Sequence, residues 1–152
     1  MLTMTGSVLP SAPGHFAVSL RYVGAMADPR SRKLLFVLFS DDACRQNHAF
    51  MYALDLHRNG HDVHVIIEGA ATKVLTEMAL ADSRTGQLLR EVHEAGLVVG
   101  ACARASSGCA SGDPTRDVAE IARANGIALL SDMEGHASIE PFVRDGYEVV
   151  VL

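Results

Sequence analysis

Two of the three cysteines lie close together near the end of an apolar run, in a stretch of small residues. Cys102 directly follows "LVVGA", and Cys109 comes seven residues later, inside "SSGCASGDP". A cysteine thiolate is a nucleophile and a ligand for soft metals, so both are candidate reactive groups. The third cysteine, Cys44, lies four residues before His48. On a helix the two would share a face, which is compatible with a thiol–imidazole pair, two metal ligands or plain packing.

More polar side chains follow the apolar runs, where strands of a parallel sheet would end. They are Asp41 and Asp42 after the first run, and Asp132 and His136 after the fourth. In an open parallel sheet, ligands bind at the edge formed by the carboxyl ends of the strands. Helix N-termini face the same edge, and their partial positive charge favours a thiolate over a thiol. We therefore expect Cys102 as the nucleophile, with these four residues forming its pocket; a small buried hydrophobe is the alternative for Cys102.

The elements that would hold these residues alternate between strands and helices. The run "KLLFVLF" is continuously apolar rather than alternating, which is typical of a strand covered on both faces by helices. Strands are predicted over residues 33–39, 62–67, 97–101, 127–131 and 147–152, with helices over 42–58, 71–95 (broken near 82–86), 114–124 and 138–145. This order predicts an α/β fold: a three-layer α/β/α sandwich around a mainly parallel five-stranded sheet.

The residues before the first predicted core strand form a separate part of the chain. We divide the sequence into an N-terminal extension, residues 1–32, and an α/β domain, residues 33–152. Within the extension, apolar residues alternate with small or polar ones over residues 15–23, which is the pattern of a half-buried strand. The segment is therefore an extra edge strand or a subunit contact, or else an incidental extension before Met26.

Length, charge and cysteine count exclude several classes of protein. A chain of 152 residues is sufficient for one domain with a sizeable core. Thirteen basic and 18 acidic residues give a net charge of −5 without a basic cluster, which argues against nucleic-acid binding. The apolar runs are too short to span a membrane, and no export signal precedes them. An odd number of cysteines favours reduced thiols in a cytoplasm over a disulfide-bonded scaffold.

The sequence lacks the residues that several well-known classes of protein need. A receiver domain needs an aspartate after the third strand and a later lysine, but Cys102 stands there and no lysine follows Lys73. The chain contains no G-x-G-x-x-G turn after a strand, no glycine–lysine phosphate loop and no G-x-S-x-G elbow. Zinc binding remains an alternative, although the spacing matches no compact ligand pattern. Its candidate ligands are Cys44, His48, Cys102, Cys109 and His136.

The layout from "KLLFVLFSDD" through "DVHVIIEGAATKVL", "GLVVGACARA", "NGIALLSDM" and "GYEVVVL" resembles the DsrE/DsrF-like sulfur-relay family. The resemblance covers residues 33–152, and its most specific feature is the cysteine after the third strand, Cys102. It implies a parallel α/β/α sandwich that assembles as a homo-oligomer, a trimer or hexamer. It also implies that Cys102 carries persulfide sulfur from a donor protein or small thiol to an acceptor, with no metal or organic cofactor.

Within that hypothesis the other thiols have supporting roles. Cys109 would be a resolving thiol that forms a disulfide with Cys102, provided the Cα atoms come within about 7 Å; the alternative is a bystander. Cys44 and His48 would line the opposite wall of the site and lower the pKa of the Cys102 thiol if His48 is charged. Two other functions stay open. One is a non-catalytic oligomeric binding module for a small molecule or regulator, and the other is a thiol/imidazole metal-binding protein.

Overall fold

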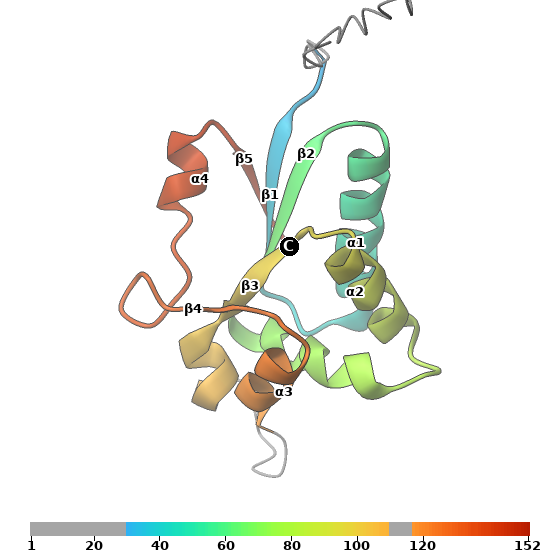
Figure 1. Cartoon of the computed structure of the whole chain (residues 1–152), viewed down its shortest axis with the longest axis vertical. Coiled ribbons are helices and arrows are strands. Elements are labelled where there is room, and N and C mark those ends of the chain that lie inside the picture. The colour runs from blue at the N-terminus through green and yellow to red at the C-terminus, as the bar shows by residue number, and fades with distance from the viewer. Residues whose placement is uncertain (1–29, 110–116) are drawn as a thin grey trace, which may run out of the picture.

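The computed structural model of the chain describes residues 30–109 and 117–152. Five strands form one sheet in which all neighbours are parallel, in the order β4-β3-β2-β1-β5 (Figure 1). The strands are β1 (Lys33–Leu38), β2 (Asp62–Ile67), β3 (Val98–Cys102), β4 (Leu129–Leu130) and β5 (Glu148–Val151). Helices lie on both faces of this sheet, so the predicted α/β fold is confirmed.

The helical elements connect consecutive strands. They are α1 (Ala43–Arg58), the 3₁₀ helix η1 (Gly69–Ala79), α2 (Arg84–Glu94), the π-helical turn η2 (Ala105–Cys109), α3 (Val118–Ala124) and α4 (Glu140–Arg144). From β1 to β4 the chain steps across the sheet in one direction. Because crossovers between parallel strands are right-handed, the helices of these steps lie on one face. The step from β4 to β5 returns to the opposite edge, so α4 lies on the other face (Figure 1).

The two faces of the sheet are covered to very different depths. Side chains of β1 point alternately to the two sides: Phe36 and Leu38 join a large core beneath the helices α1, η1, α2 and α3, whereas Leu35 and Val37 join a small cluster on the α4 side. All four are buried, as expected for a continuously apolar strand. The five residues of α4 cover only part of their face. The second layer is therefore thin.

Local capping decides where two helices begin. The side chain of Ser83 accepts a hydrogen bond from the Gly86 backbone N–H, at 3.0 Å, and starts α2 after the break that the sequence predicted. Asp117 accepts from the N–H groups of Ala119 and Glu120 and starts α3. The predicted helix start at residues 113–114 lies outside the described residues, as does the predicted edge strand at 15–23.

Two strand boundaries differ from the prediction. β3 runs one residue further than predicted, so Cys102 is the last residue of the strand rather than the first residue after it. β4 contains two residues instead of five, because its ladder to β3 consists only of the pairs Ala101–Leu129 and Cys102–Leu130. The edge of the sheet beside Cys102 is consequently formed mostly by the irregular segment that follows β4.

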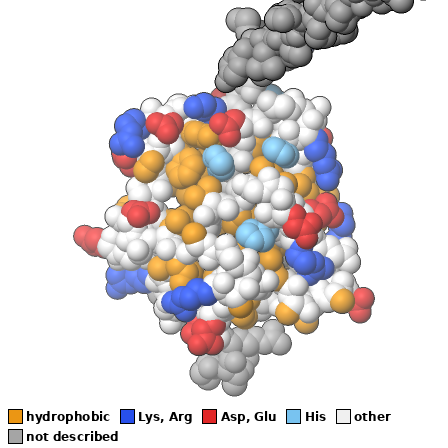
Figure 2. Space-filling view, viewed as in Figure 1, with side chains coloured by type: hydrophobic (Ala, Val, Ile, Leu, Met, Phe, Trp, Pro, Cys, Tyr) orange, Lys and Arg blue, Asp and Glu red, His pale blue; other side chains and the backbone are white. Residues whose placement is uncertain are grey.

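The surface carries mixed charges. On the face seen in Figure 2, acidic and basic side chains alternate around the rim, and hydrophobic side chains are visible between them. Large apolar side chains remain exposed, among them Phe39, Met133, Ile139, Val143 and Val151. No helix within residues 30–109 and 117–152 is long and apolar enough to cross a lipid bilayer.

Candidate functional site

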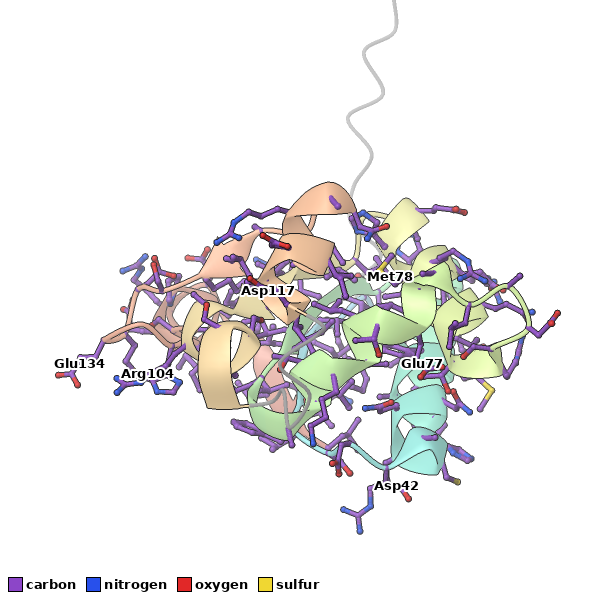
Figure 3. The ribbon with its side chains drawn as sticks, turned by 90° about the horizontal axis from the view of Figure 1, so that it is seen from below. Asp42, Glu77, Met78, Arg104, Asp117 and Glu134 are labelled. Carbon is purple, nitrogen blue, oxygen red and sulfur yellow. The ribbon has the colours of Figure 1, made fainter. Side chains whose placement is uncertain are left out.

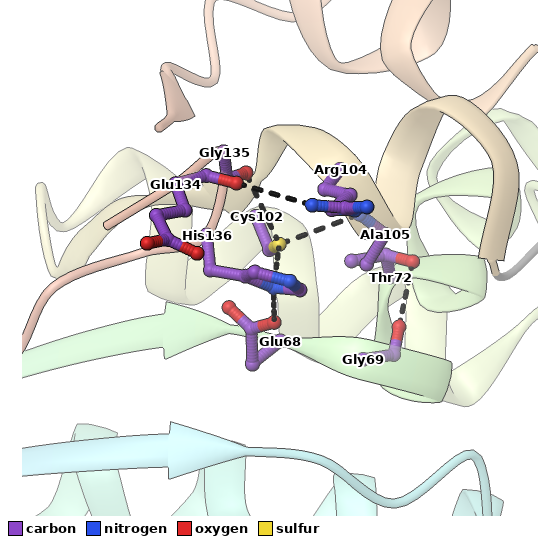
Figure 4. A network of polar contacts seen from close by, with 9 residues as sticks. All are labelled: Glu68, Gly69, Thr72, Cys102, Arg104, Ala105, Glu134, Gly135 and His136. Carbon is purple, nitrogen blue, oxygen red and sulfur yellow. Dashed lines mark hydrogen bonds and ion pairs between the residues drawn. The ribbon is translucent and has the colours of Figure 1, made fainter. Parts of the chain in front are cut away.

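Cys102 lies at the carboxyl end of β3 and is completely buried. Its sulfur accepts a hydrogen bond from the Ala105 backbone N–H, with N and Sγ 3.3 Å apart. The thiol can donate to the Gly135 carbonyl, 3.8 Å away, and the Nδ1 atom of His136 lies 3.4 Å from Sγ (Figure 4). The structure thus brings together the two residues, Cys102 and His136, that the sequence places 34 positions apart.

Glu68 is the third member of the cluster, and the sequence analysis did not single it out. It directly follows β2, and its carboxylate oxygen Oε1 lies 3.2 Å from Nδ1 of His136 (Figure 4). Its side chain is only 10% exposed, and its other oxygen, Oε2, is buried without a hydrogen-bond partner among the residues that the structure describes. The signal was present in the sequence, because Glu68 follows a strand just as Asp41 and Asp132 do.

A tight loop between β4 and α4 holds His136 over the sulfur. Met133 and His136 exchange backbone hydrogen bonds of 3.0 and 2.8 Å, and between them Glu134 and Gly135 have φ of 51° and 93°. Glycine adopts the second conformation without strain. Arg104 fastens this loop: its backbone N–H donates to the Gly135 carbonyl at 3.0 Å, and its guanidinium donates to the Glu134 carbonyl at 3.3 Å.

The environment of Cys102 favours the protonated thiol. Burial raises the pKa of Cys102 above its ordinary value, and the nearby Glu68 carboxylate raises it further. Hydrogen bonds from the Ala105 and Arg104 backbone N–H groups lower the pKa, but by less. The backbone N–H groups at this edge thus act in the predicted direction, but desolvation outweighs them, so the pKa of Cys102 is raised overall.

One imidazole nitrogen faces both the sulfur and the carboxylate. Nδ1 of His136 holds at most one proton, which it can share with Cys102 or with Glu68. When Nδ1 takes the thiol proton, the resulting imidazolium lies between a thiolate and a carboxylate, and both negative charges stabilise it. The three side chains can therefore move a proton off a sulfur atom that is buried.

A pocket of about 560 Å³ opens beside this cluster, on the thin face of the sheet. Its walls are mainly apolar, and Glu68 and His136 contribute titratable groups to them. The apolar walls include Val37, Ile66, Met133, Ile139, Val149 and Val151. His136 is 38% exposed, so its ring connects this pocket to the sulfur behind it.

The second cysteine–histidine pair is on the surface. Cys44 and His48 lie one turn apart on α1, with Sγ and Nδ1 separated by 3.6 Å. The same Nδ1 is 2.7 Å from the Cys44 carbonyl oxygen, and the ring packs near Tyr52. Among the described residues, the polar contacts of this pair do not connect it to Cys102. Cys109 ends η2, and its side chain lies outside the description, so the predicted disulfide is not tested.

The predicted pocket aspartates are also elsewhere. Asp42 caps α1, where its side chain accepts from the Arg45 N–H at 2.9 Å, and Asp41 pairs with Lys73 at 3.5 Å. Asp132 is exposed on the loop that carries His136. In Figure 3, Asp42 lies well apart from Arg104 and Glu134, the residues above the buried thiol. Among the predicted site residues whose side chains the structure describes, His136 is the one that meets Cys102, and Glu68 joins them.

The comparisons with known proteins find a relative over part of the chain, and they do not indicate a function. A protein of Archaeoglobus fulgidus, described as an uncharacterized protein, is 41% identical over 44 residues, which cover 29% of this chain and 72% of that protein. The two chains are relatives over that segment. No protein-family model matches the chain, and no solved structure matches it.

Proposed function

We propose that this protein belongs with the DsrE/DsrF-like sulfur-relay proteins and carries persulfide sulfur on Cys102. The observation that carries the proposal is the contact of the Cys102 sulfur with His136 Nδ1 at 3.4 Å, which is backed by the Glu68 carboxylate 3.2 Å from the same nitrogen. A thiol, an adjacent base and a group that stabilises the charged base are the components of an activated nucleophile. All three are at the carboxyl edge of a parallel sheet, where ligands bind in this class of fold.

The transfer is an exchange of sulfur–sulfur bonds. When the imidazole carries its hydrogen on Nε2, His136 Nδ1 takes the Cys102 proton, and the thiolate attacks the outer sulfur of a donor persulfide, R–S–SH. A bond forms between Sγ and that sulfur while the donor bond breaks, so the products are the Cys102 persulfide and R–S⁻. The proton held by His136 passes to R–S⁻ and yields R–SH. An acceptor thiolate repeats the attack in the other direction, and no external oxidant or reductant is consumed.

The burial of Cys102 makes this reaction depend on a local opening. The sulfur lies behind His136 and beneath the loop that Arg104 fastens. A donor in the apolar pocket meets the imidazole first, so the loop has to move before the donor reaches Sγ. Such openings are ordinary for loops held by few hydrogen bonds. A buried carrier site also protects a persulfide from stray thiols in solution.

The proposal also includes the cellular compartment and the partners of the protein. Cys44 and Cys102 are free thiols, which fits a reducing cytoplasm. The partners are a sulfur donor and a sulfur acceptor, either proteins or small thiols, and neither nucleic acid nor a membrane takes part.

Exposed apolar side chains around α4 and β5 favour a homo-oligomer, a trimer or hexamer, that covers them. Light scattering of the purified chain measures that assembly.

The test is mass spectrometry of the intact, chelator-treated protein after incubation with glutathione persulfide. We expect the wild type to gain the mass of one sulfur atom and to lose it again on addition of an acceptor thiol. Cys102→Ser is expected to abolish the gain. Cys44→Ser is the matched control and keeps it, because its sulfur is exposed and lies outside the Glu68–His136 cluster.

Two further variants test whether His136 takes the Cys102 proton and whether Glu68 supports it in that role. His136→Gln and Glu68→Gln are expected to slow sulfur loading by about 10- to 100-fold while leaving the Cys102 thiol present. A sulfur gain that persists in Cys102→Ser, or that disappears in Cys44→Ser, would assign the carrier to another cysteine and overturn the proposal. Circular dichroism of each variant separates loss of function from loss of fold.

The apolar pocket favours a second candidate function, a non-catalytic binding module. Its volume of about 560 Å³ suits a small organic molecule, and its walls are mostly apolar. This function predicts that a ligand raises the melting temperature of wild type and Cys102→Ser equally, and that no sulfur is gained. Mutation of a wall residue, Val149→Asp, would abolish that shift.

A further inference from the structure

We propose that Glu68, Cys102 and His136 also form a binding site for a single Zn²⁺ ion. The inference goes beyond sulfur carriage, and it does not require the proposed function to be correct. The three side chains come from the ends of β2 and β3 and from the loop after β4. One sulfur, one imidazole nitrogen and one carboxylate oxygen all lie within 4.8 Å of one another.

The separations of the donor atoms fit a tetrahedral ion. With zinc–sulfur bonds of about 2.3 Å and zinc–nitrogen or zinc–oxygen bonds of about 2.0–2.1 Å, tetrahedral ligands are about 3.3–3.6 Å apart. Sγ and Nδ1 are 3.4 Å apart, and Nδ1 and Oε1 are 3.2 Å apart. Binding therefore needs only small movements of side chains that already converge.

The carboxylate of Glu68 supplies an independent observation. A buried carboxylate oxygen is costly unless a hydrogen-bond donor or a cation satisfies it. Oε1 contacts the imidazole, whereas Oε2 is buried and has no hydrogen-bond partner within residues 30–109 and 117–152. The side chain is nine-tenths buried. A divalent ion between this carboxylate and the sulfur would give the carboxylate the further partner that Oε2 lacks among the described residues.

The donor set selects the kind of ion. Thiolate and imidazole ligands favour zinc and neighbouring transition metals, whereas Mg²⁺ and Ca²⁺ prefer oxygen ligands alone. A metal ion also removes the obstacle to ionising Cys102, because a coordinating thiol loses its proton to solvent. Nδ1 must then be unprotonated, so the imidazole carries its hydrogen on Nε2.

Three protein ligands leave a fourth position, which is typical of zinc sites that bind a water or a small ligand rather than purely structural sites. Glu68 and His136 line the apolar pocket, so this position is open to a molecule bound there. The ion would use the same sulfur that the proposed function uses. Zinc and persulfide therefore exclude each other on Cys102, and zinc is expected to block sulfur loading.

The test is titration of the metal-free full chain with Zn²⁺ alone, by calorimetry in competition with a chelator. We expect one ion per chain with a Kd below about 1 μM. Cys102→Ser is expected to weaken binding by at least about 100-fold, and Glu68→Gln by at least about 10-fold. Cys44→Ser and His48→Gln, which remove the exposed pair, are matched controls and leave the affinity unchanged.

Cobalt gives a second readout that does not depend on activity. Co²⁺ at this site is expected to show the charge-transfer absorption of a thiolate ligand, which disappears in Cys102→Ser and remains in Cys44→Ser. Binding that survives Glu68→Gln and Cys102→Ser, or that is lost with Cys44→Ser, would overturn the proposal, as would the absence of sub-micromolar binding. Because sulfur loading is measured with chelator present, either proposal can fail while the other stands.

Discussion

Among the described residues, two cysteine–histidine pairs have nearly the same separation and opposite surroundings. Cys44 and His48 are neighbours on one helix, exposed, with sulfur and nitrogen 3.6 Å apart. Cys102 and His136 are distant in sequence, and their sulfur and nitrogen are 3.4 Å apart at the end of a buried strand. In the surface pair the histidine nitrogen also contacts a backbone carbonyl of its own helix, whereas in the buried pair it contacts the carboxylate of Glu68.

The difference shows that residue type and spacing do not by themselves make a reactive site. The surface pair is exposed, and interactions between exposed polar groups contribute little to stability. In the buried pair each proton has to be placed on the sulfur, the imidazole or the carboxylate, because little water is there to stabilise a charge. Four experiments compare the two pairs directly.

The largest expected difference is in thiol reactivity. Iodoacetamide is expected to modify Cys102 about 100-fold more slowly than Cys44 in the native, metal-free protein, which corresponds to about 2.7 kcal/mol for all causes together. Burial and a raised pKa act in the same direction. Peptide mapping by mass spectrometry measures both rates. In urea the two rates should converge, and equal rates in native buffer would show that the buried description of Cys102 is incorrect.

Removing each histidine should affect stability very differently. His136→Ala removes the imidazole that contacts the buried carboxylate of Glu68, so we expect a loss of about 1–3 kcal/mol in the free energy of unfolding. His48→Ala removes an exposed ring and is expected to stay within about 0.5 kcal/mol of wild type. Urea denaturation measures both. The cost of His136→Ala should shrink in a Glu68→Gln background, and an unchanged cost would contradict the stated cause.

Mutation of Asp42 tests whether this residue only caps a helix or also lines the Cys102 pocket, as the sequence predicted. Asp42→Ala removes the cap of the helix that carries the surface pair, so it is expected to cost about 1 kcal/mol of stability. Sulfur loading on Cys102 should not change, because Asp42 lies apart from that cluster. If Asp42→Ala loaded sulfur more slowly at a temperature where the variant is folded, Asp42 would have to act at the Cys102 site.

The smallest expected effect concerns the loop over the sulfur. Arg104→Ala removes the guanidinium contact with the Glu134 carbonyl but keeps the backbone N–H that holds Gly135. An exposed hydrogen bond contributes little, so alkylation of Cys102 is expected to accelerate about threefold. Cys44 serves as the internal reference and should keep its rate. A slower rate for Cys102 would show that Arg104 does not restrain the loop.

The fold could be predicted largely from the sequence because its signals are local. Continuous apolar runs marked the strands of a parallel sheet, and Asn59 ends α1 as the pattern indicated. The two-residue β4 was missed because its length depends on pairing with β3 and not on its own hydrophobicity. The unequal covering of the two faces depends on strand order, which no local pattern contains.

The sequence by itself determined which polar residues follow the strands, and hence that Cys102 and His136 belong to one edge of the sheet. It also determined the Cys44–His48 pair, because a spacing of four on a helix brings side chains together regardless of the rest of the fold. Only the tertiary structure decided that Glu68 joins the buried pair, that the aspartates do not, and that burial raises the pKa of the thiol. The reason is physical: these properties depend on burial and on contacts between residues 34 to 68 positions apart, which packing creates.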